Sequence, residues 1–175
     1  FPGLGVLWNY MASQASEEIF AMVGDDFVYE TPGWDQMIIN DFKSCNKDNI
    51  MMLHCNDGLH GPGNRFRDRY VQSVNPFIHR KYYEINNYYL RDEFTHQFLD
   101  TWLNDIFSTI DRKYYRHDIM IRHLHFSQTG VVDNVTQNLR QRSVYNSAKT
   151  LYSKLKPERG LEVVRLNNYI KNETI

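Results

Sequence analysis

The chain has 175 residues, the length of one domain, and carries 20 basic and 21 acidic residues for a formal net charge of -1 at pH 7. Hydrophobic residues make up 42% and charged residues 23%, which is enough apolar material for a packed core. The balanced charge does not support a general nucleic-acid or membrane-surface binder. No apolar run approaches the roughly 20 residues that a transmembrane helix needs. We therefore expect a single domain over residues 1–175, with no nucleic-acid partner and no transmembrane segment.

The two cysteines, Cys45 and Cys55, are too few to form a disulfide framework. Cys45 falls at the end of a predicted helix and Cys55 on a predicted strand. Free buried thiols are typical of a reducing compartment, so we expect a cytoplasmic protein.

The first half of the chain alternates helical and strand patterns. Leu4, Leu7 and Met11 recur at helical spacing, whereas the short continuous apolar run over residues 19–23 is typical of a buried strand. The predicted elements are a helix over residues 4–16, a strand over 19–23, a helix over 34–45, a strand over 50–55 and a loop over 56–64.

The second half of the chain is richer in helical patterns. Phe98, Trp102 and Ile106 repeat every fourth position, which predicts a strong helix. The predicted elements are a strand over residues 70–74, a short helix opened by Pro76 and ending at Tyr83, a helix over 93–110, a strand over 114–125, and helices over 135–155 and 160–170. The order indicates a mixed α/β domain with a helical C-terminal tail over about residues 133–175.

An acidic tip, Gly24-Asp25-Asp26, ends the first apolar run abruptly. Two adjacent carboxylates at the end of a buried strand are costly unless they have a partner, and a divalent cation is an effective one. A turn over residues 31–34 and a helix follow, and strand ends of this kind are where open α/β sheets bind their ligands. Asp25 and Asp26 suit a complex of Mn²⁺ or Mg²⁺ with a diphosphate, and an ordinary Asp-rich turn or helix cap is the alternative.

A second candidate is the pair His123 and His125 on the last predicted strand. Residues two apart on a strand face the same side, so one imidazole can ligate a metal while the other binds phosphate or orients its neighbour. A half-buried pair of histidines with a purely structural role is the alternative.

Two further acids, Asp100 and Asp105, border the apolar arc of the predicted helix over residues 93–110. A carboxylate beside apolar surface is partly desolvated, which raises its proton affinity and suits a general base. A solvated helix face or an N-terminal cap is the alternative.

The predicted loop after the second strand contains Asp57 and Gly58, followed by Gly61 and Gly63. Glycines let backbone amides approach a ligand or let a loop close as a lid, and a plain surface loop is the alternative.

Taken in chain order, the segments that contain these candidate residues resemble one protein family. The run Gly-Asp-Asp-Phe-Val-Tyr-Glu-Thr-Pro-Gly-Trp-Asp over residues 24–35 is similar to the metal-binding strand end of GT-A-fold glycosyltransferases, near the family 2 group. Segments 56–58, 75–84, 100–105 and 121–125 follow in the order that this family has, and the resemblance covers about residues 3–135. It implies an α/β fold with a GT-A-like mixed sheet flanked by helices.

The resemblance also implies roles for individual residues. Asp25 and Asp26 resemble the Asp-x-Asp signature that holds Mn²⁺ or Mg²⁺ against a nucleotide-sugar diphosphate, with Asp26 as the direct ligand and Asp57 also in the cofactor-binding set. The third position is Phe27, so the signature is shortened.

The resemblance assigns the remaining roles to residues later in the chain. His123 or His125 resembles the histidine that completes the metal shell. Asp100 resembles the acid that deprotonates the acceptor hydroxyl in inverting enzymes, with Asp105 as the alternate. The implied function is metal-dependent transfer of a sugar from a nucleotide-sugar donor to a hydroxyl acceptor.

One feature departs from the family pattern. A first βαβ segment precedes the acidic strand in such folds, whereas a single predicted helix precedes it here. The resemblance therefore implies the C-terminal portion of a domain that is incomplete at the N-terminus. It also predicts an exposed sheet edge or apolar face that drives assembly into a homo-oligomer.

Two other functions fit the same residues. A degenerate GT-A-like module would bind ligands without turnover, and a metal-dependent phosphohydrolase would use the same acids on a phosphate ester.

Overall fold

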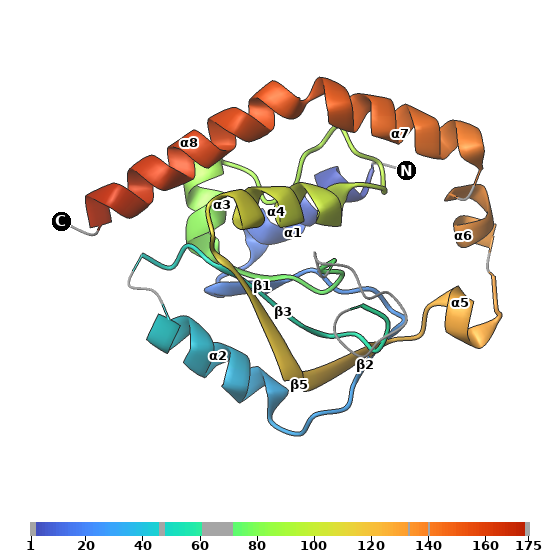
Figure 1. Ribbon diagram of the computed structural model, residues 1–175, viewed down its shortest axis with the longest axis horizontal. Coiled ribbons are helices and arrows are strands. Elements are labelled where there is room, and N and C mark those ends of the chain that lie inside the picture. The colour runs from blue at the N-terminus through green and yellow to red at the C-terminus, as the bar shows by residue number, and fades with distance from the viewer. Residues whose placement is uncertain (1–2, 46–47, 61–71, 133, 140, 174–175) are drawn as a thin grey trace.

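A five-stranded mixed sheet, covered by helices, forms the body of the chain (Figure 1). The computed structural model describes residues 3–45, 48–60, 72–132, 134–139 and 141–173. The strands are β1 (Ile19–Ala21), β2 (Phe27–Tyr29), β3 (Met52–Asn56), β4 (Phe77–His79) and β5 (Lys113–His123). The helices are α1 (Leu4–Gln14), α2 (Trp34–Cys45), α3 (Arg80–Asn86), α4 (Leu99–Thr109), α5 (Phe126–Thr129), α6 (Asn134–Leu139), α7 (Arg142–Lys154) and α8 (Lys156–Glu173). The predicted mixed α/β class is confirmed.

The longest strand, β5, joins the two parts of the sheet. The strand order is β1-β4-β3-β5-β2, in which β3 and β5 are parallel and the other pairs are antiparallel. The register between β3 and β5 shifts after Cys55. Cys55 pairs with Arg116, but the next residue, Asn56, pairs with Met120. This irregularity bends β5, so that its second half pairs with β2. Strand β1 ends the order at the other side, and the predicted self-association at such an edge stays a prediction.

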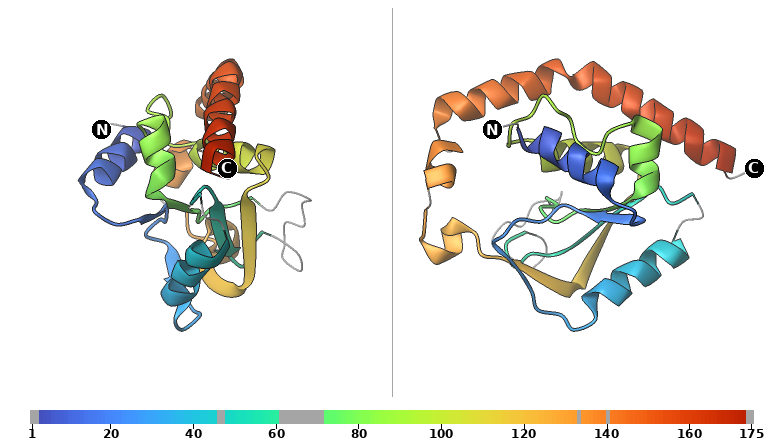
Figure 2. Two further views of the ribbon diagram at one scale, coloured as in Figure 1. Left: turned by 90° about the vertical axis from the view of Figure 1, so that its left-hand side faces the viewer. Right: turned by 180° about the vertical axis from the view of Figure 1, so that it is seen from behind.

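Alternate residues of the central strand β3, together with Met51 just before it, supply two separate cores. Met51 and Leu53 belong to one cluster, with Ile38 and Phe42 of α2. Met52 belongs to the other cluster, which contains residues from α1, α3, α4 and α8. The period of two follows from strand geometry, and it places α2 on one face and α1, α3, α4 and α8 on the opposite face (Figure 2).

Several predicted elements are confirmed closely. The helix over residues 34–45 has the bounds of α2, and the patterns over 4–16, 50–55 and 114–125 correspond to α1, β3 and β5 with small shifts at their ends. Pro157 lies in the first turn of α8, where its missing N–H costs no hydrogen bond. Residues 61–64 of the predicted loop lie outside the described residues.

Other predictions about the elements are wrong. No strand covers residues 72–74, the described part of the strand predicted over 70–74. Pro76 does not open a helix, because Phe77–His79 forms β4 between β1 and β3, and α3 begins only at Arg80. The strand β2 was not predicted, since its three residues owe their extended form to pairing with β5.

The predicted helix over residues 93–110 begins later, at Leu99, because α1 holds the preceding segment in a loop. Asn9 accepts hydrogen bonds from the backbone N–H groups of Tyr89 and Leu90 at 2.7 and 2.8 Å and donates to the Leu90 carbonyl at 2.6 Å. Gly5 packs so closely on the Arg91 carbonyl that a side chain there would collide with it. These contacts fix the loop that leads into α4.

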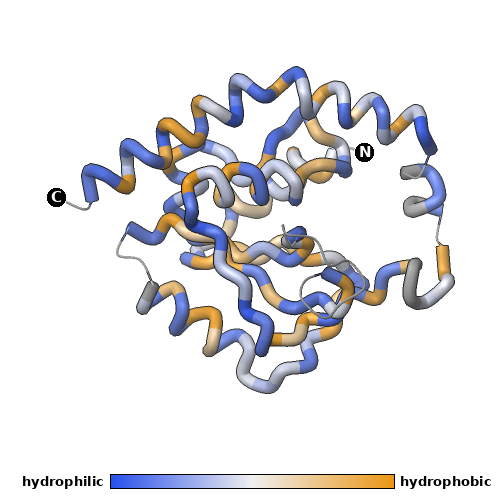
Figure 3. Tube along the Cα trace, in the orientation of Figure 1, coloured by the Kyte–Doolittle hydropathy of each residue, from blue (hydrophilic) through white to orange (hydrophobic). Residues whose placement is uncertain are grey.

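The C-terminal helices α7 and α8 are mostly hydrophilic (Figure 3), and α8 is attached through a buried carboxylate. Glu162 is 0% exposed and accepts hydrogen bonds from the hydroxyls of Tyr82 and Tyr88 and, at 3.1 Å, from Nε1 of Trp102. Burial raises the pKa of Glu162, although the three donors act in the opposite direction. This cluster joins α8 to α4, to α3 through Tyr82, and to the segment after α3 through Tyr88.

Among the described residues, no helix combines the length and the apolar character needed to cross a membrane.

Replacing Glu162 with Ala should lower the free energy of unfolding by about 3 kcal/mol, because donors on Tyr82 and Trp102 would be buried without an acceptor. Glu162→Gln keeps an acceptor oxygen and should cost less. The pKa of Glu162 is raised above 4.5 in the folded protein. The stability of the wild type relative to Glu162→Gln should therefore be greatest below pH 4.5, and it should decline as the pH rises through the folded-state pKa. Denaturant unfolding at several pH values measures this, and equal stability of wild type and Glu162→Ala would contradict it.

Candidate functional site

Three segments that are distant in sequence meet at the end of β5. The backbone N–H of His123 donates to the carbonyl of Asp57 at 3.0 Å, and the N–H of Leu124 donates to the carbonyl of Asp26 at 2.8 Å. Phe27 pairs with His123 in the ladder between β2 and β5. The segment after β1, the loop after β3 and the end of β5 are therefore joined through the main chain.

The side chains of Asp26 and His123 interact directly. Nε2 of His123 lies 3.0 Å from Oδ2 of Asp26, and the imidazole stacks on Phe27 with ring centroids 4.6 Å apart. The histidine side chain is 15% exposed, whereas the carboxylate is 45% exposed, so one side of Asp26 remains open to a ligand. Nδ1 of His123 is buried and has no hydrogen-bond partner among the described residues.

His125 lies beside this pair, with its ring centroid 5.2 Å from that of His123. Partial burial and the neighbouring imidazole of His123 lower the pKa of His125. The lowered pKa favours the neutral imidazole at neutral pH, which is the form that can ligate a cation.

A cavity of about 1200 Å³ brings most of the predicted site residues together. Asp25, Asp26, His123 and His125 line it from the sheet, and Asp100 lines it from the start of α4. Further polar residues in the lining are His60, Gln72, His96, Gln97 and Thr101. A cavity of this size with carboxylates and imidazoles suits a polar ligand rather than a purely apolar one.

Asp100 is held in a defined orientation at the first turn of α4. Its Oδ2 accepts a hydrogen bond from Nε2 of Gln72 at 3.0 Å, and its Oδ1 accepts one from the backbone N–H of Thr101 at 2.7 Å. The backbone of Phe98, just before the helix, has φ of 71°, a left-handed conformation that costs energy for a bulky residue. Asn104 reinforces the arrangement by donating to the carbonyls of Asp100 and Ser73, at 2.9 and 3.0 Å.

Asp57 supports the cavity without lining it. Its buried carboxylate accepts hydrogen bonds from the backbone N–H groups of Leu59 and His60 and lies 2.6 Å from Nδ1 of His60, which does line the cavity. Burial opposes ionisation, but the hydrogen bonds from His60 and Leu59 outweigh it and lower the pKa of Asp57. Asp57 therefore orients His60 from behind.

Asp105 lies elsewhere and faces the C-terminal helices. Its carboxylate accepts a hydrogen bond from the Tyr152 hydroxyl, and Nε of Arg159 is 3.5 Å away. The Arg159 guanidinium lies over the ring of Tyr152, 3.8 Å from its centroid. The structure thus brings Asp100 to the cavity but gives Asp105 contacts between α4, α7 and α8.

The residues present can hold a cation only together with ligands from a substrate. Within the described part of the chain, no group of three His, Cys, Asp or Glu side chains is placed to hold a metal ion. Asp26 offers an exposed carboxylate oxygen and His125 an imidazole nitrogen to the same cavity, whereas Nε2 of His123 contacts Asp26 and Nδ1 of His123 is buried. Mn²⁺ and Mg²⁺ commonly take one or two protein ligands and complete their coordination with water and phosphate oxygens, and this donor set fits that pattern.

Sequence reasoning missed Gln72 and His60. Gln72 stood in a segment predicted as a strand, and its link to Asp100 spans 28 positions, so no local pattern could reveal it. His60 lies three positions after Asp57, and this spacing, which allows an Asp–His hydrogen bond across a turn, was a usable signal.

Comparisons of the chain with protein-family models, with curated proteins and with solved structures found no match.

If Asp26 ligates Mn²⁺, replacing Gly24 with Ala should weaken binding of the ion about tenfold, as changes beside a metal ligand commonly do. The added Cβ would come 2.6 Å from Oδ1 of Asp26 and push the carboxylate from its position. Electron paramagnetic resonance of free Mn²⁺ measures the affinity. Gly160→Ala, where a Cβ meets nothing within 4 Å, is the control. An unchanged affinity in Gly24→Ala would show that the ion does not depend on the placement of Asp26.

Proposed function

We propose that the chain carries the site of a metal-dependent glycosyltransferase, which moves a sugar from a nucleotide-sugar donor to a hydroxyl acceptor. The observation that supports this most is the cavity in which Asp26, His123 and His125 at the sheet face the same space as Asp100 at the start of α4. The resemblance over residues 24–35 and the later segments gives these groups their order and roles.

The donor diphosphate would lie at the end of the sheet. Asp26 and His125 would hold Mn²⁺ or Mg²⁺, and His123 would orient Asp26 through its 3.0 Å contact. A bound cation of this kind supplies positive charge that stabilises the departing diphosphate. Asp25 lines the same part of the cavity and adds to the attraction for the cation.

Asp100 would act as the base in the transfer step. It takes the proton of the acceptor hydroxyl while that oxygen forms a bond to the anomeric carbon, and the bond from that carbon to the diphosphate breaks with its electron pair on the diphosphate. Oδ1 of Asp100 accepts hydrogen bonds from the backbone N–H and the hydroxyl of Thr101, whereas Oδ2 accepts one from Gln72 and can accept a second. That second position on Oδ2 would take the acceptor hydroxyl, and inversion at the anomeric carbon follows from a single displacement.

Mn²⁺-dependent binding of a nucleotide sugar tests the donor side. Isothermal titration with UDP- and GDP-hexoses in the presence of Mn²⁺ should show binding that Asp26→Ala weakens at least about tenfold. Asp35→Ala, on an exposed acid of α2, is the matched control and should bind as the wild type does. Phosphate release from simple esters without any preference for sugar nucleotides would favour a phosphohydrolase. Absence of Mn²⁺-dependent binding to any of these donors would contradict the proposal.

Replacing Asp100 with Asn should lower the rate of sugar transfer by about 100-fold or more and leave Mn²⁺-dependent donor binding intact, because the base acts only in the chemical step. Gln72→Met removes the donor to Oδ2 at similar side-chain size and should lower kcat about tenfold, with little change in KM for the donor. Steady-state kinetics with chromatographic detection of the product measures both changes. A full rate in Asp100→Asn would exclude Asp100 as the base.

A further inference from the structure

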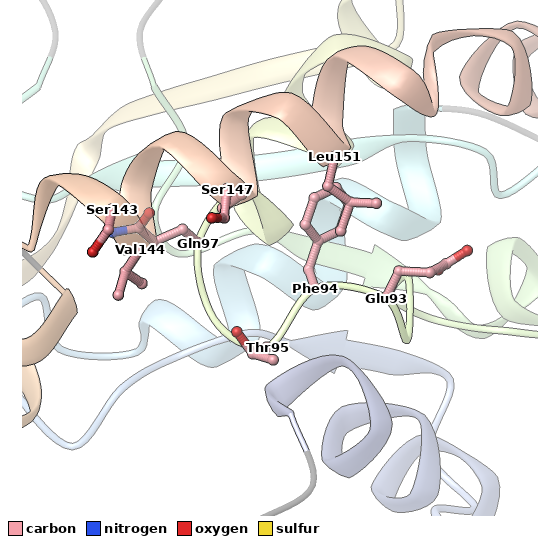
Figure 4. Close-up of a pocket in the computed structure, with 9 residues that line it drawn as sticks. Glu93, Phe94, Thr95, Gln97, Ser143, Val144, Ser147 and Leu151 are labelled. Carbon is pink, nitrogen blue, oxygen red and sulfur yellow. The ribbon is translucent and has the colours of Figure 1, made fainter.

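A second cavity, of about 410 Å³, lies between the loop before α4 and the helix α7 (Figure 4). Side chains of α7 form one wall, and side chains from residues 93–97 form the other. Its volume is within the range of sites that bind small ligands. None of the residues assigned to the donor or to the base lines it.

Apart from one acid, the described lining of this cavity consists of uncharged polar and apolar side chains. Thr95, Gln97, Ser143 and Ser147 supply hydroxyl and amide groups. Alongside them, Val144, Ala148 and Leu151 supply apolar surface, and the buried Phe94 lies behind them.

Glu93 is the charged residue in the described lining. It forms an ion pair with Arg91, and its side chain points away from the other lining residues in Figure 4. Because the described lining contains no cation, this cavity offers nothing to balance a phosphate or a carboxylate.

The second cavity adjoins the first. Gln97 lines both, and the neighbouring residues Val144 and Tyr145 of α7 line the second and the first cavity, respectively. Phe98 and Tyr145, whose ring centroids are 5.6 Å apart, both line the first cavity. Asp100, two positions after Phe98, lines it as well, so a ligand in the second cavity lies next to the space that Asp100 borders.

Both walls of the second cavity are fixed by other contacts. The backbone N–H of Leu4 donates to the carbonyl of Thr95 at 2.7 Å, so α1 holds the loop. On the other side, Tyr152 of α7 stacks on Phe98 with ring centroids 5.0 Å apart and also contacts Phe94. A site whose walls are already in place loses little conformational entropy when it binds a ligand.

We infer that this second cavity binds a neutral sugar unit of the acceptor, placing one of its hydroxyls toward Asp100. The inference rests on the proposed function and names the acceptor class. A pyranose ring has an apolar face of C–H groups, which suits Val144 and Leu151, and a rim of hydroxyls, which suits the side chains of Thr95 and Ser147. The absence of cations from the described lining sets this cavity apart from a diphosphate site.

Filling the cavity is the direct test. Ser147→Trp places an indole between α7 and the loop, and Ser147 is exposed enough for the helix to tolerate the change. Ser153→Trp adds the same group at another exposed position of α7 and is the matched control. Saturation-transfer NMR measures binding of methyl glucopyranoside, methyl galactopyranoside and methyl mannopyranoside to each variant, and thermal unfolding checks that both variants are folded.

At least one methyl hexopyranoside should bind the wild type and Ser153→Trp, and Ser147→Trp should weaken that binding at least tenfold. Ser147→Trp should also raise KM for the sugar acceptor, while hydrolysis of the donor by water proceeds at the wild-type rate. If none of the three sugars binds the wild type, or if Ser147→Trp binds them unchanged, the inference is overturned. Sugar binding that Ser147→Trp removes, in a protein with no Mn²⁺-dependent donor binding, would support the sugar site and contradict only the proposed function.

Discussion

The arrangement of the site depends on the hydrogen-bonded ladder of β5. This strand pairs in parallel with β3 along its first half and antiparallel with β2 along its second half. Because its last residue, His123, binds the carbonyl of Asp57 and the following residue binds that of Asp26, both loops are positioned by one strand. The 3.0 Å contact between Asp26 and His123 is therefore set by backbone pairing, and a slip of one residue in β5 would turn His123 and His125 to the opposite face.

The other side of the cavity is positioned through α1 and α4. Asn9 fixes the loop after α3 through three hydrogen bonds, so the chain enters α4 at one place and in one direction. The left-handed residue Phe98 turns the chain there, and α4 begins directly afterwards with Asp100 in its first turn. A positive φ at a phenylalanine is costly, and the packing of Phe98 against Tyr145 and its stacking on Tyr152 offset part of that cost.

Sequence patterns predicted those elements in which the hydrophobic pattern extends over several turns, such as α2, whose Ile38 and Phe42 pack into the core. They failed where three residues are extended only because a neighbour pairs with them, as in β2 and β4. Much of the candidate site could be assembled from the ordered resemblance, since Asp26, His123 and Asp100 line one cavity. The support of Asp100 by Gln72 could not, because a hydrogen bond between remote loops leaves no periodic trace.

The orientation of α4 links the buried carboxyl group of Glu162 in α8 to the cavity. Trp102 follows Asp100 by two positions and donates to Glu162 of α8, while Asp105, on another side of α4, contacts Tyr152 and Arg159. These contacts restrain rotation of α4 about its axis, and a rotation would move the Asp100 carboxylate away from its donors. Asp105 thus helps to attach α7 and α8 to α4. The attached helix α7 also forms one wall of the second cavity. On this view the C-terminal helices act on the site in two ways, by holding the proposed base in position and by forming the place where an acceptor would lie.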